Sequence, residues 1–207
     1  MTINRHVHLG LMLLAGLLAG VGCSLLADAL SPYAAKDPFH YAVQLLLRLG
    51  FIYATAAGLW LGLLQKSWGR ALLGAIIGIG VGFLYTSTWP SVYFLATTLG
   101  MPLLLGGLLA VVLGANREDW LRHLGLRLVR GLLAGFIFSV VCVIISRLVV
   151  SYIFPPSQED LPPGEFNRPF FAMLRIALPV SLGAASMLFF PLLHWASARN
   201  LTSPANK

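Results

Sequence analysis

The apolar segment between Leu126 and Phe154 restricts this chain more than any other feature of its sequence. Arg127 and Arg130 stand near its start, and after them a single further charge, Arg147, interrupts a run dominated by apolar residues. A helix rises about 1.5 Å per residue, so about 20 apolar residues cross the hydrocarbon core of a bilayer. The segment therefore predicts a membrane-spanning helix.

The rest of the chain has the same character. Apolar residues make up 58% of the 207 and charged residues only 10%, whereas about a quarter of the residues of soluble domains are charged. We predict an all-α, polytopic integral membrane protein with six transmembrane helices in one membrane domain, residues 1–207. The predicted spans cover about residues 9–29, 42–64, 71–88, 92–114, 126–154 and 171–195. We expect an interfacial amphipathic helix at 115–125 and a disordered tail at 196–207.

Lysine and arginine are distributed unequally between the two sets of loops. One side holds Arg5, Lys66, Arg70, Arg117, Arg122, Arg127, Arg130, Arg199 and Lys207. The other side holds only Lys36 and Arg168, together with several carboxylates. Basic loops stay in the cytoplasm, so we predict that both termini are cytoplasmic and that the protein resides in the inner membrane of a bacterium.

The net charge of +7 does not indicate a nucleic-acid partner, because the basic residues are separated by apolar runs and form no continuous stripe. The expected partners are membrane lipids, other membrane subunits or a second copy of the chain.

Parts of the sequence resemble one another. Residues 8–20 match 123–135, residues 70–74 match 130–134, and residues 99–106 match 176–183. These matches predict three helical hairpins related by parallel repetition. Leu, Gly and Ala dominate all membrane helices, so chance similarity is the alternative. In either case Gly16, Gly20, Gly131 and Gly135 are expected at helix contacts, because glycine lets two backbones approach closely.

Four ionisable residues fall within or at the edge of the predicted spans: Asp28, Arg48, Arg147 and Arg175. Counting 1.5 Å per residue from the helix boundaries places all four in the outer third of the bilayer. Three cations and one anion at one depth are a candidate ligand-binding site for an anion, such as a carboxylate, a phosphate or a lipid headgroup. The alternative is that each arginine extends to the lipid headgroups on its own, with Asp28 paired to one of them.

Pro102 and Pro179 lie near the middle of their predicted spans. A proline inside a helix removes one backbone hydrogen bond and kinks or breaks the helix. Such kinks line the binding sites of many transporters, although others serve only packing.

The chain carries no sequence signature of a catalytic or metal site. The histidines lie at span ends and in loops, without the spacing that would bind haem or zinc. We expect no enzyme activity, no metal and no cofactor. The sequence therefore favours a non-enzymatic membrane protein, either transporter-like or binding a solute or lipid near the outer membrane face. The alternative is an accessory or assembly subunit of a larger membrane complex, which the faces of small residues on several helices favour.

Overall fold

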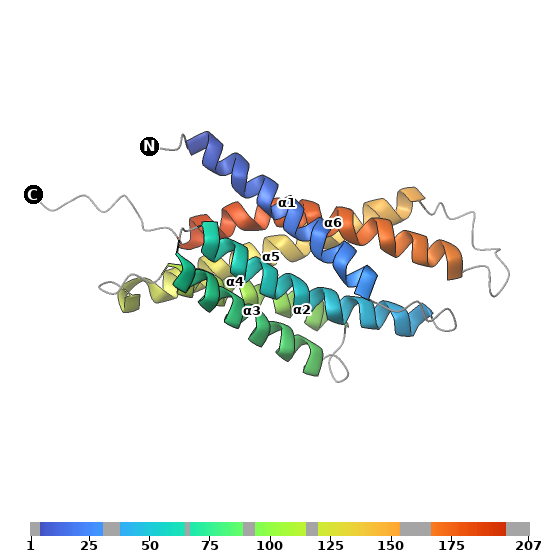
Figure 1. Cartoon of the computed structure of the whole chain (residues 1–207), viewed down its shortest axis with the longest axis horizontal. Coiled ribbons are helices and arrows are strands. Elements are labelled where there is room, and N and C mark those ends of the chain that lie inside the picture. Colours follow the sequence, from blue (N-terminus) through green and yellow to red (C-terminus); the bar gives the residue numbers. More distant parts are fainter. Residues whose placement is uncertain are drawn as a thin grey trace, which may run out of the picture.

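The computed structural model describes residues 5–30, 38–64, 67–88, 94–114, 120–153 and 167–197, and within these ranges the protein consists of six α-helices (Figure 1). They are α1 (Arg5–Leu30), α2 (Pro38–Leu64), α3 (Trp68–Thr88), α4 (Phe94–Leu113), α5 (Trp120–Ile153) and α6 (Asn167–Ser197). The predicted tail beyond Ser197 lies outside the described residues.

Five of these helices are long and apolar enough to cross a membrane. The qualifying stretches of described residues are His6–Leu30, Gln44–Leu64, Trp68–Tyr85, Leu124–Tyr152 and Arg175–Ser197. This confirms an all-helical protein of the polytopic membrane class. In α4 the apolar stretch among the residues whose side chains are described is Gly100–Leu113, which is shorter than a full crossing. The sixth span therefore remains a prediction.

Helix α5 begins before the predicted span of residues 126–154. We expected residues 115–125 to form a separate interfacial helix, but from Trp120 onward they belong to α5, which continues without a break to Ile153. Gly125 is the weakest helix former near this junction, and a single glycine costs a helix only about 1 kcal/mol. That cost is too small to end a helix of 34 residues.

The helices continue through their internal prolines. Pro102 lies inside α4, and Pro179 and Pro191 lie inside α6. Neither of the two predicted kink sites, Pro102 and Pro179, therefore interrupts its helix.

Glycines join the helices into three close pairs, in which α1 packs on α6, α3 on α2 and α5 on α4. In each pair the odd-numbered helix contributes two glycines four residues apart. A Cβ built on any of these glycines would lie within 3 Å of the partner helix's backbone, which leaves no room for a side chain. The glycines and their nearest partners are Gly16 and Gly20 against Ser186 and Leu182, Gly74 and Gly78 against Gly58 and Ala54, and Gly131 and Gly135 against Gly106 and Pro102. The four glycines predicted at helix contacts are all found there.

The centre of the bundle is aromatic. The rings of Tyr53 and Phe138 stack with their centroids 5.4 Å apart, and Phe138 lies 5.1 Å from Phe189 in a tilted arrangement. These three side chains come from α2, α5 and α6 and are all buried. They connect the α1–α6, α2–α3 and α4–α5 pairs through one core.

The outer surface of the bundle is apolar as well. Leu18, Ile76, Phe83 and Leu148 are each exposed over 60% or more of their surface, and they come from three different helices. Soluble proteins rarely leave so many large apolar side chains uncovered. This surface fits contact with lipid.

Candidate functional site

The C-terminal end of α1 is joined to α6 by an ion pair. Arg175 of α6 places its Nε 3.2 Å from Oδ2 and 3.3 Å from Oδ1 of Asp28, which lies in the last turn of α1. The two side chains are 48% and 25% exposed. Two residues that are distant in the sequence are thus brought together, because α1 and α6 pack along their length.

Arg48 of α2 reaches the same helix end. Its guanidinium donates a hydrogen bond to the carbonyl of Leu30, the last residue of α1. The final carbonyls of a helix have no partner within the helix and carry partial negative charge, so a cation there is favourable. Two of the three predicted arginines therefore converge on the C-terminal end of α1.

Arg147 makes no such contact. It is exposed on α5, and it forms no hydrogen bond or ion pair with any described residue. Asp28 supplies the only carboxylate in the described ranges, and it is held by Arg175. The charges of Arg48 and Arg147 are therefore not balanced by any described carboxylate.

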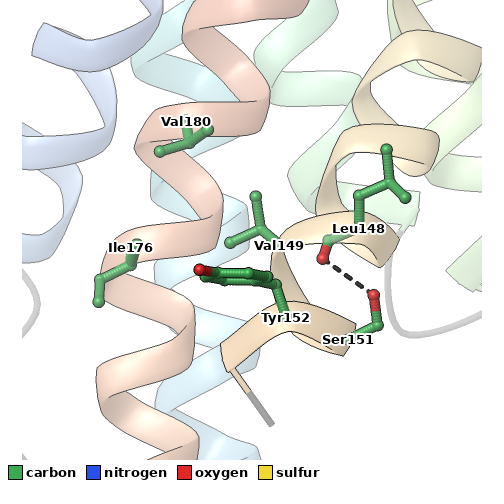
Figure 2. A pocket seen from close by; sticks show the side chains of 6 residues that line it. All are labelled: Leu148, Val149, Ser151, Tyr152, Ile176 and Val180. Atoms are coloured by element: carbon green, nitrogen blue, oxygen red, sulfur yellow. Dashed lines mark hydrogen bonds between the residues drawn. The ribbon is translucent and has the colours of Figure 1, made fainter. Parts of the chain in front are cut away.

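A groove of about 600 Å³ opens between the C-terminal part of α5 and the N-terminal half of α6. Its walls are Leu148, Val149, Ser151 and Tyr152 of α5 with Ile176 and Val180 of α6 (Figure 2). Figure 2 shows the Tyr152 side chain extending from α5 toward α6, and this residue is 91% exposed. Ser151 donates its hydroxyl to the carbonyl of Leu148 at 2.9 Å, so it turns its one hydrogen back to its own helix. The groove is therefore apolar.

The groove lies beside two of the predicted arginines. Arg147 precedes Ser151 by four residues on α5, which makes them neighbours on the helix surface. Arg175 directly precedes Ile176 on α6. Sequence reasoning identified the arginines but missed the groove, which depends on how α5 and α6 separate. The available signal was Tyr152, because aromatic residues near the end of a span favour the membrane interface.

Three buried serines of α1, α5 and α6 form hydrogen bonds within their own helices. Ser24 donates to the carbonyl of Gly20 at 2.9 Å, Ser139 to that of Gly135 at 3.0 Å, and Ser181 to that of Ala177 at 2.6 Å. Each bond stays within one helix turn. These serines therefore provide no polar pathway through the described part of the bundle.

Two side-chain contacts lie at the end of the bundle opposite the Asp28–Arg175 ion pair. The rings of His8 in α1 and His194 in α6 meet edge to face, with their centroids 5.2 Å apart. The guanidinium carbon of Arg130 lies 4.7 Å from the centre of the Trp195 ring. Within the described ranges no three His, Cys, Asp or Glu side chains are grouped so as to hold a metal ion.

No protein-family model, curated protein or solved structure matches this chain.

Proposed function

We propose that this protein is a non-enzymatic membrane protein, transporter-like or lipid-binding, whose ligand is an amphipathic anion held at the outer end of α5 and α6. The observation that carries this proposal is the groove between these helices, with an apolar lining and with Arg147 and Arg175 beside it. Its volume of about 600 Å³ falls within the range of about 300–1,000 Å³ that is usual for ligand sites. An acyl chain would occupy the groove, and its anionic headgroup would lie against Arg147.

The charge distribution supports an anion rather than a cation or a neutral lipid. Asp28 is already paired with Arg175, and Arg48 lies at the end of α1. Arg147 has no partner among the described residues, and an arginine near the bilayer is costly unless a counter-charge or the headgroup region compensates it. An anionic headgroup supplies that counter-charge.

The accessory-subunit alternative loses its main motivation. It rested on faces of small residues that a partner helix might use, yet the paired glycines of α1, α3 and α5 are already filled by neighbouring helices of the same chain.

The positions of the start of α1 and the end of α6 support six membrane crossings, which requires that α4 crosses as well. The first turn of α1 and the last turn of α6 lie at the same end of the bundle (Figure 1), and His8 and His194 meet there. Helices that alternate in direction return to the starting side only after an even number of crossings. We therefore propose six spans, with both termini on the side of the basic loops, in the inner membrane of a bacterium.

The packing supports the three-hairpin repeat. The close pairs join one hairpin to the next (α2 to α3, α4 to α5, and α6 to α1), and the even-numbered helices also contact one another. Ser24 and Ser139 correspond in the repeat, and each bonds to the corresponding glycine four residues before it, Gly20 or Gly135. Three related hairpins around a common centre would produce this arrangement.

The test is native mass spectrometry of the protein released from mild detergent, which retains bound lipid, solute or partner chains. Val180→Trp fills the groove, and Leu188→Trp is its matched control, because Val180 is 46% and Leu188 45% exposed on the same helix. We expect an anionic lipid on the parent and on Leu188→Trp, and its loss from Val180→Trp and from Arg147→Gln. Equal lipid on all four proteins would show that the groove is not the site, and a bound second protein would favour the accessory subunit.

A further inference from the structure

Arg127 is a buried cation at the other end of the bundle, near the start of α5. Only 5% of the residue is exposed. Its Nη1 atom is buried and has no hydrogen-bond partner among the described residues. A guanidinium does not lose its proton in proteins, so this group carries a full charge.

Gly114, at the end of α4, makes the space that Arg127 occupies. A Cβ built on Gly114 would lie 2.8 Å from Nε of Arg127 and 2.9 Å from its Cδ. The Gly114 amide donates to the carbonyl of Ala110 at 3.2 Å, which closes the last turn of α4. The guanidinium group therefore lies beside the C-terminal end of α4, whose partial negative charge attracts it.

That attraction does not balance a whole charge, because a helix end amounts to about half an elementary charge. The only carboxylate among the described residues is that of Asp28, and it is bound to Arg175 at the other end of α1. A buried guanidinium without a counter-charge is strongly destabilising. Within the part of the chain that the structure describes, no negative charge balances Arg127.

We propose that Arg127 binds a phosphate group, with an anionic phospholipid of the surrounding leaflet as its source. In the sequence, α4 ends in an apolar run at Leu113, and Arg122, Arg127 and Arg130 precede the long apolar run of α5. Arg127 therefore lies close to the boundary of the apolar region, near the depth of lipid phosphates. The planar guanidinium matches two phosphate oxygens at once. Basic sites between helices on the cytoplasmic side typically bind anionic headgroups.

Arg130 strengthens the site. It lies three residues after Arg127, on the neighbouring position of the helix surface. Its guanidinium rests over the ring of Trp195, a half-exposed side chain of the type that favours the headgroup region.

The first measurement needs only the parent protein. Its melting temperature is followed in phosphatidylcholine–detergent micelles to which phosphatidylglycerol, inorganic phosphate or more phosphatidylcholine is added. A ligand that binds the folded state alone raises the melting temperature. We expect phosphatidylglycerol to raise it by several degrees at millimolar lipid, and phosphatidylcholine to leave it unchanged. A rise with inorganic phosphate alone would assign the site to a soluble phosphate compound.

The variants locate the effect. Arg127→Gln removes the charge at nearly constant size and should abolish the rise, and Arg127→Lys should keep only part of it. Arg130→Gln should reduce the rise in part, and Arg70→Gln, on α3, is the control and should retain the full rise. All variants are also prepared with Val180→Trp, so that lipid in the α5–α6 groove does not contribute.

Two results would overturn the proposal. One is a full response to phosphatidylglycerol in Arg127→Gln. The other is a parent protein whose melting temperature rises with no phosphate compound, combined with a loss of stability in the Glu118→Gln or Asp119→Asn variant. That combination would show that a carboxylate of the chain itself supplies the counter-charge of Arg127. Because the parent measurement stands alone, failure of Arg127→Gln to fold does not remove the test.

Discussion

The hydroxyl oxygens of Tyr53 in α2 and Ser186 in α6 lie 2.8 Å apart at the centre of the bundle. Ser186 Oγ also lies 2.6 Å from the carbonyl oxygen of Leu182. A hydroxyl has one hydrogen, so both contacts are used when Tyr53 donates to Ser186 and Ser186 donates to Leu182. Tyr53 is 3% exposed and Ser186 is fully buried, so neither hydroxyl has access to water in exchange.

This chain of hydrogen bonds predicts that removing the Tyr53 hydroxyl and removing the Ser186 hydroxyl lower the free energy of unfolding by unequal amounts. Tyr53→Phe leaves Ser186 bonded to Leu182 and should lower the free energy of unfolding by less than about 1 kcal/mol. Ser186→Ala leaves the Tyr53 hydroxyl buried without its partner and should cost about 1–3 kcal/mol. The measurement is thermal or denaturant unfolding in one detergent.

The double variant makes this prediction sharper. Adding Tyr53→Phe to Ser186→Ala removes the unpaired hydroxyl, so the double variant should be more stable than Ser186→Ala alone. Ser24→Ala, which removes a bond within one helix, serves as the control. Additive losses in the double variant would rule out the proposed direction of donation.

A second prediction concerns the contact between α4 and α5. A Cβ on Gly135 would lie 2.6 Å from the carbonyl carbon of Pro102, so Gly135→Leu must push the two helices apart. Overpacking costs about 1–3 kcal/mol, and the melting temperature in detergent should fall by several degrees. Gly125→Leu is the control on the same helix, because a Cβ there meets nothing within 4 Å. Equal melting temperatures for the two variants would show that α5 does not pack on α4 through this face.

The ion pair at the outer end of α1 gives a third prediction. A fully buried charge site would lose about 2–5 kcal/mol on truncation of one partner, and an exposed pair less than about 1. Arg175 is 48% exposed, so we expect Asp28→Ala and Arg175→Ala each to cost less than about 1 kcal/mol. Arg175→Lys should be close to neutral, because an ammonium can also lie against the Asp28 carboxylate in place of the Arg175 Nε. A loss above 2 kcal/mol for either alanine variant would indicate that the pair is shielded from the surroundings.

Much of the fold could be predicted because membrane helices depend on local properties of the sequence. The apolar runs define the helices, and the glycines four residues apart predicted the close contacts of α1 and α5. The continuation of α5 back to Trp120 was missed, because the same residues also fit an amphipathic interfacial helix. Both interpretations make these residues helical, and the sequence does not show that this helix joins the span without a break.

The candidate site was predicted less completely. Depth along each helix can be counted from the sequence, and this placed Asp28, Arg48, Arg147 and Arg175 at one level. The direction in which a side chain points from its helix depends on the neighbouring helices. The sequence therefore could not predict that Asp28 pairs with Arg175, or that Arg147 has no partner among the described residues. For the same reason Arg127 was interpreted only as a marker of orientation, although its side chain turns inward to the end of α4.

The last prediction decides between five and six crossings. In a protein without Cys23 and Cys142, single variants Thr2→Cys, Ser157→Cys and Ser203→Cys are exposed to a membrane-impermeant thiol reagent in intact cells. Six crossings with cytoplasmic termini predict labelling of Ser157→Cys alone, with the other two labelled only after the membrane is opened. If α4 does not cross, the helices after it are inverted, so Ser203→Cys would be labelled and Thr2→Cys and Ser157→Cys would be protected. Labelling that places Thr2 and Ser203 on opposite sides would therefore show that α4 stays on one side of the membrane, and equal labelling of Ser157 and Ser203 would contradict the six-span topology.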